Sequence, residues 1–117
     1  MALHDQRVNY ETIKAWVLEA YFDFCRDRGV AMRMSHLEVL GYVDYNFEVS
    51  FERPIERLMF KVVELILTGS WHEAVEKNIR KDIDDIMAEY DLERLLAEIP
   101  RQEEDLFRRD LKVLQII

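Results

Sequence analysis

The sequence predicts one mainly α-helical domain over residues 1–117, a bundle of about five helices. Apolar residues recur at steps of three and four through most of the chain, which is the spacing of a helix face. Only three glycines and two prolines interrupt this pattern. Two Ser-x-x-Glu capping boxes, beginning at Ser35 and Ser70, mark helix starts. With 50% apolar residues, the chain can bury a single core.

The first helix is predicted from about Asn9 to Arg28, after a frayed end over residues 1–8. Asn9 is a favourable N-cap because its side chain can accept a hydrogen bond from the first turn. A short helix is expected after Ser35. Residues 43–51 alternate apolar and polar side chains, which is typical of a strand, so a short β element remains an alternative there.

The most buried helix is predicted over residues 54–68. Pro54 suits a first helical turn, and the residues after it are apolar almost all round the helix. Another helix should follow Ser70, with an apolar face that reaches Tyr90. Its exposed side offers three ion pairs at i, i+4 spacing: Glu73–Lys77, Glu76–Arg80 and Lys81–Asp85.

Two further helices are predicted near the end of the sequence. Asp91 can cap a short helix over residues 92–98, which should stop before Pro100. The last helix, over about residues 102–114, begins with acidic residues and ends with basic ones, as the helix dipole favours. The final two residues, Ile116 and Ile117, are apolar and are expected to pack against the body of the protein.

No arrangement of residues predicts catalysis. Cys25 is the only cysteine, so it cannot form an intramolecular disulfide, and it lies on the apolar side of its helix. The histidines, His4, His36 and His72, do not show metal-ligand spacing. The glycines are too few for a phosphate-binding loop. We therefore expect no catalytic residue, no metal, no cofactor and no enzymatic activity.

The acidic residues are concentrated in one stretch. The whole chain has a net charge of −8, and residues 82–105 hold ten acidic and two basic residues, so this segment contains the entire surplus. Such a segment is either a solubility device or a surface for a basic partner. Direct binding to nucleic acid is disfavoured because phosphates need basic residues. The predicted contacts for a partner are Asp82, Asp84, Asp85, Glu89, Asp91 and Glu93, with Tyr42, Tyr45 and Phe47 as candidate apolar anchors.

The compartment is expected to be the cytoplasm. No apolar run approaches the ~20 residues of a membrane span. The first twenty residues contain acidic side chains and no uninterrupted apolar segment of the kind found in secretory signals. A single cysteine suits a reducing compartment.

Residues 58–117 resemble the C-terminal part of small bacterial immunity proteins, which neutralise polymorphic and contact-dependent growth-inhibition toxins. The resemblance lies in Ile66-Leu67-x-Gly69-x-Trp71, in the stretch from Tyr90 to Pro100, in Glu103-Glu104, and in Phe107-x-x-Asp110-Leu111-Lys112-Val113-Leu114. It implies a non-enzymatic cytoplasmic protein that binds the toxic domain of a cognate effector and blocks its active site. Many such toxins are basic nucleases, so the implied partner is a basic protein.

A second interpretation is a self-associating structural or regulatory helical module, for example a homodimer. It is motivated by the apolar end of the sequence and by the alternating segment 43–51, which could pair with another chain.

Overall fold

The computed structural model describes residues 10–28, 51, 53–68 and 73–117. Helices account for 85% of these residues and no strand occurs among them, which confirms the predicted all-α class. None of the helices in these segments is long and apolar enough to cross a membrane. The described helices are α1 (Tyr10–Arg28), α3 (Pro54–Thr68), α4 (Glu73–Glu89), α5 (Leu92–Leu96) and α6 (Arg101–Val113).

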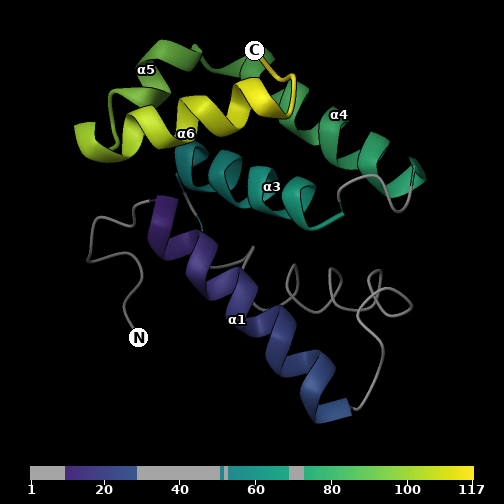
Figure 1. The fold of residues 1–117 in the computed structure, drawn as a ribbon. Coiled ribbons are helices and arrows are strands. Elements are labelled where there is room, and N and C mark those ends of the chain that lie inside the picture. Colours follow the sequence, from purple (N-terminus) through teal and green to yellow (C-terminus); the bar gives the residue numbers. More distant parts are fainter. Residues whose placement is uncertain (1–9, 29–50, 52, 69–72) are drawn as a thin grey trace.

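Helix α3 lies at the centre of the bundle (Figure 1). It contacts each of the other four described helices, most extensively α4 and α1. Helix α1 packs on one side of α3, while α4, α5 and α6 gather on the other side (Figure 1). The central helix therefore carries the core that both sides share.

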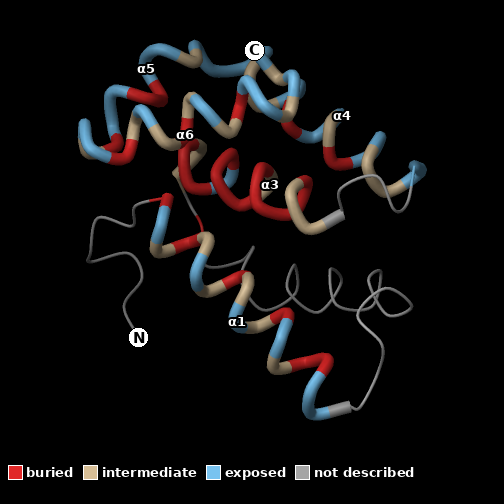
Figure 2. Tube along the Cα trace, viewed as in Figure 1, coloured by how far each residue is buried: buried red, intermediate tan, exposed pale blue. Residues whose placement is uncertain are grey.

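The sequence of α3 explains this position. Its bounds are the predicted ones, and its apolar side chains point in nearly all directions around the axis. Leu58, Met59, Val62 and Val63 are completely buried, and Figure 2 shows α3 as the most continuously buried helix. A helix that is apolar almost all round can be stable only when neighbours cover every side, and here four helices share that task.

A charged cluster around Lys61 interrupts the apolar surface of α3. The Lys61 ammonium lies 3.1 Å from a Glu64 carboxylate oxygen and 3.5 Å from an Asp82 oxygen on α4. The Glu64 side chain is only 2% exposed and that of Lys61 13%. A buried carboxylate is tolerable only with a cation beside it, so Lys61 neutralises Glu64 and also joins α3 to α4.

The beginning of α1 is attached to α6 by contacts far apart in sequence. The Tyr10 hydroxyl donates a hydrogen bond to an Asp110 carboxylate oxygen at 2.7 Å, and the Lys14 ammonium lies 3.4 Å from the same oxygen. The rings of Tyr10 and Phe107 are 4.7 Å apart. The backbone N–H of Glu11 donates a hydrogen bond to the Glu103 carboxylate at 3.4 Å. A residue of α6 thus provides an acceptor for one of the N–H groups in the first turn of α1 that have no partner within the helix.

Helix α6 ends in a Schellman motif. Gln115 has a φ angle of 61°, in the left-handed region. The N–H of Ile116 donates to the Leu111 carbonyl at 2.8 Å, and that of Gln115 donates to Lys112 at 3.0 Å, which is the paired bonding of this motif. The Leu114 carbonyl accepts a hydrogen bond from Arg80 at 2.8 Å, which fastens the turn to α4.

Several predicted details are confirmed. Cys25 is buried as a free thiol, and Trp16 packs against the core. In α4, Glu73 pairs with Lys77 at 3.6 Å and Glu76 with Arg80 at 3.3 Å.

Other details were wrong. Within the described residues, the predicted Lys81–Asp85 ion pair is not formed. Helix α5 ends at Leu96 instead of residue 98, because a turn leads into Pro100, and Asp91 begins it without a side-chain cap bond. Ile116 packs against the core, but Ile117 is 46% exposed.

Some predictions fall outside the described residues. These are the frayed end, the helix after Ser35, the candidate anchors Tyr42, Tyr45 and Phe47, all of the 43–51 strand except Phe51, the capping residue Ser70, Trp71 and the three histidines. Phe51 itself is buried and is not in a strand.

Candidate protein-binding surface

All six predicted contact residues are exposed to solvent. Four lie on the second half of α4, Asp91 is the N-cap residue of α5, and Glu93 lies in its first turn. Helix α4 presents its acids outward because Ile79 and Ile83, four residues apart, are buried against the core.

The four acids of α4 do not share one face. Asp82, Asp85 and Glu89 are separated by three and four residues, so they follow one side of the helix. Asp84 is about 200° around the axis from Asp82, and so lies on another side. Acidic residues that are close together in the sequence therefore lie on two different sides of α4.

Two of the six acids already have cations beside them. Asp82 lies 3.5 Å from the Lys61 ammonium. Glu93 accepts two hydrogen bonds from Arg108, at 2.7 and 3.2 Å, and these lower the pKa of its carboxyl group. Arg108 also donates to Glu104 at 2.8 Å. A partner would gain less from Asp82 and Glu93 than from acids without such a neighbour.

Glu89 and Asp91 meet in a groove where α3, α4 and α5 come together. We call it the acidic groove; its volume is about 470 Å³ and it is lined by Pro54, Glu89, Tyr90, Asp91, Arg94, Leu95 and Glu98. Glu98 is paired with Arg53 at 2.7 Å. Within the described part of the chain, no ion pair involves Glu89 or Asp91. The groove therefore has a negative surplus.

The end of α4 makes this negative charge stronger. Glu89 is the last residue of α4, and the last turn of the helix contains no basic residue. Since the C-terminal end of a helix already carries partial negative charge, an acid there is unfavourable by about 0.3–1 kcal/mol. The stability of α4 therefore does not explain the acid at position 89.

Tyr90 is an aromatic side chain in the same groove, and it is 37% exposed. The sequence pattern assigned it to the apolar face of α4, which was wrong, because the helix ends at Glu89 and the chain turns before α5. The signal available in the sequence was Asp91, the residue that begins the next helix. Sequence reasoning also missed Arg94 and Glu98 as groove residues, because their proximity to Glu89 depends on the fold.

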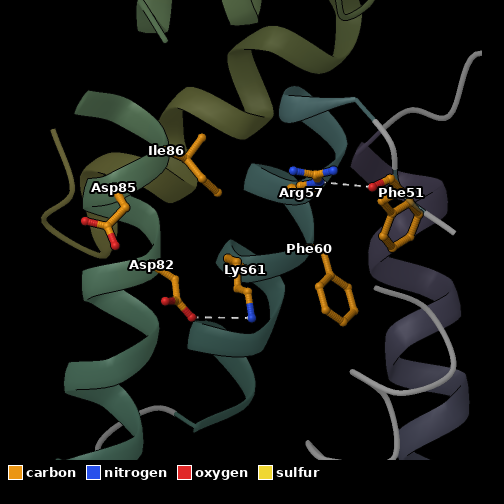
Figure 3. A pocket seen from close by; sticks show the side chains of 7 residues that line it. All are labelled: Phe51, Arg57, Phe60, Lys61, Asp82, Asp85 and Ile86. Atoms are coloured by element: carbon orange, nitrogen blue, oxygen red, sulfur yellow. Dashed lines mark hydrogen bonds and ion pairs between the residues drawn. The ribbon is translucent and has the colours of Figure 1, made fainter. Parts of the chain in front are cut away.

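A second hollow lies between α3 and α4 and has charges of both signs (Figure 3). We call it the mixed-charge pocket; its volume is about 230 Å³ and it is lined by Phe51, Arg57, Phe60, Lys61, Asp82, Asp85 and Ile86. Arg57 donates from Nε to the backbone carbonyl of Phe51 at 3.1 Å, and Lys61 points towards Asp82 (Figure 3). Asp82 and Asp85 were predicted from charge alone, and the Lys61 cation beside Asp82 was not.

Comparison of the chain with protein-family models, with curated proteins and with solved structures finds no match in any of the three.

Proposed function

We propose that this protein inhibits a basic partner by binding to it, in the manner of an immunity protein that blocks the toxic domain of a cognate bacterial effector. One observation carries the proposal. Two exposed acids without an ion pair in the described chain, Glu89 and Asp91, flank the exposed Tyr90 at the negative end of α4. The resemblance of residues 58–117 to immunity proteins favours the same function.

The acidic groove suits a cationic side chain of the partner. Carboxylates of Glu89 and Asp91 can receive an Arg or Lys head group, while the Tyr90 ring can lie against its alkyl stem. Aromatic side chains that become buried supply much of the affinity of protein interfaces, and charge complementarity mainly increases the rate and selectivity of association.

A nuclease is the partner class that this chemistry favours. Nuclease clefts are basic because they bind phosphates, so an acidic surface complements them. Occupation of such a cleft by the α4–α5 region would exclude nucleic acid without any chemical step by the inhibitor itself. No catalytic residue or cofactor in this chain is required.

Co-purification from the native host tests the proposal. The full chain is used as bait at low and at moderate salt, and bound proteins are identified by mass. A stoichiometric basic partner that is lost as salt rises supports the proposal, because exposed charge pairs are screened. The triple variant Asp84→Lys, Asp85→Lys, Glu89→Lys should lose that partner. If the triple variant still binds the partner, binding through the acidic residues of α4 is contradicted.

Self-association is the alternative class, and one observation favours it. Val113 is 73% exposed and Ile117 46% exposed, so two apolar side chains near the end of α6 face solvent. Sedimentation velocity over a range of protein concentrations distinguishes the two classes. A monomer at all concentrations contradicts self-association, while a dimer that Val113→Ser dissociates supports it.

A further inference from the structure

One carboxylate of the acidic groove is already paired with a cation of the same chain. Glu98 lines the groove, and its Oε1 atom lies 2.7 Å from the Nη2 atom of Arg53. Glu89 and Asp91, in the same groove, make no ion pair within the described residues. The carboxylates that a basic partner would meet in the groove are therefore not equivalent.

The ion pair between Arg53 and Glu98 adds little to the stability of the fold. The two side chains are 42% and 41% exposed, so water and salt screen their attraction. Arg53 directly precedes α3, and its backbone carbonyl accepts hydrogen bonds from the N–H groups of Glu56 and Arg57 at 3.1 Å. A cation at this position faces the positive end of the helix dipole, which is unfavourable. The charge of Arg53 therefore matters more for the groove than for the fold.

Arg53 halves the net negative charge of the groove. The charged residues that line it are three acids, Glu89, Asp91 and Glu98, and one base, Arg94, which sum to −2. Arg53 beside Glu98 brings this sum to −1. A cation that enters the groove is thus attracted by one net charge instead of two, and it meets Arg53 at one of the three carboxylates.

We propose that Arg53 competes with the basic partner for the acidic groove. In the unbound chain its guanidinium pairs with Glu98; a cationic side chain of the partner displaces it, and Glu98 then adds to the attraction of Glu89 and Asp91. This regulation rests on the proposed function, because it acts on the same groove. Its effect is selectivity, since a weakly basic protein gains too little from the groove to displace Arg53.

A synthetic peptide tests the competition without the native partner. Acetylated and amidated tetra-arginine is titrated into the isotopically labelled full chain, and the amide resonances of residues 89–98 are followed by NMR. Arg53→Gln should bind the peptide about two- to fivefold more tightly than the parent chain, which is the range expected for one exposed charge pair. Arg26→Gln removes the same charge from another exposed pair, with Asp23 at 2.7 Å on α1, and should bind as the parent chain does.

The side-chain signal of Arg53 reports the displacement itself. Glu98→Gln breaks the ion pair and gives the chemical shift of the released guanidinium; the peptide should move the Arg53 Nε resonance of the parent chain towards that value. The proposal is overturned if the peptide binds no form of the chain, if Arg53→Gln binds no more tightly than the parent, if Arg26→Gln gains as much, or if the Arg53 signal does not move. Failure of the proposed function is seen separately, as the absence of a basic protein in the co-purification.

Discussion

Gln115 adopts a strained backbone conformation at the C-terminal end of α6. Its φ angle of 61° is in a region that costs a residue with a Cβ atom about 1–2 kcal/mol. Glycine usually occupies this position of a Schellman motif because it has no Cβ atom. Here the motif forms with glutamine, and the hydrogen bonds of Ile116 and Arg80 hold the turn in place.

Replacing Gln115 with glycine should stabilise the protein. We expect Gln115→Gly to raise the free energy of unfolding by about 0.5–1 kcal/mol, which is the relief of strain less the extra entropy that glycine loses on folding. Chemical denaturation measures this difference. Gln115→Ala keeps the Cβ atom and should give no gain; an equal gain from alanine would contradict the explanation.

Lys61 should be the most sensitive charged residue of the core. Lys61→Met removes the cation beside the buried Glu64, and we expect a loss of about 3–5 kcal/mol of stability by denaturation. The double variant Lys61→Met, Glu64→Gln should recover part of that loss because position 64 then carries no buried charge. Lys77→Met, which breaks the exposed pair with Glu73, should change stability little. Equal effects of the two lysine variants would contradict a buried pair.

At the scale of elements, the sequence predicts the helices well where local signals determine both ends. Pro54 and the apolar run after it gave the bounds of α3, and Asp91 gave the start of α5. The end of α5 was missed because the chain turns there: the N–H groups of Glu98 and Ile99 donate to the carbonyls three residues before them. The attachment of α1 to α6 could not be predicted, since Tyr10 and Asp110 are a hundred residues apart.

Helix α4 should be more stable without its terminal acid. Glu89→Lys replaces an unfavourable charge with a favourable one at the C-terminal end, and we expect a gain of about 0.5–1 kcal/mol in thermal or chemical unfolding. Glu73→Lys makes the same charge change at the opposite end of α4 and should instead destabilise the protein. Similar effects of the two variants would contradict the dipole argument.

At the scale of the whole molecule, the acidic segment could be predicted from the sequence. Which of its acids have a cation beside them could not be predicted. Asp82, Asp84, Asp85, Glu89, Asp91 and Glu93 are all exposed, as charge alone suggests. Lys61 and Arg108 then neutralise Asp82 and Glu93, although these cations lie elsewhere in the sequence. The groove around Glu89 depends on how α5 returns towards α3, which no local pattern specifies.

The core should weaken in alkaline solution. Burial raises the pKa of Tyr10, Tyr21 and Cys25, with the Asp110 hydrogen bond adding to the effect at Tyr10. Above the ordinary values of 9.0 for cysteine and 10.0 for tyrosine, the unfolded chain loses these protons while the folded chain keeps them. The unfolded state then binds fewer protons, so stability falls as pH rises.

Denaturation from about pH 8 to about pH 11 measures this decline. Tyr10→Phe removes one of the three groups, and should reduce the slope by up to about 1.4 kcal/mol per pH unit. It should also lower stability near neutral pH, because the hydrogen bond to Asp110 is lost. An unchanged alkaline slope in Tyr10→Phe would contradict the assignment.

The central claim is that Glu89 and Asp91 bind a basic partner, and its most direct test is the affinity of the co-purified partner for three forms of the chain. The double variant Glu89→Lys, Asp91→Lys should bind at least about tenfold more weakly and with a flatter salt dependence, even though Glu89→Lys alone should raise stability. Glu19→Lys, an exposed change on α1, should bind as the parent chain does. Unchanged affinity in the double variant, or an equal loss in Glu19→Lys, would contradict the claim.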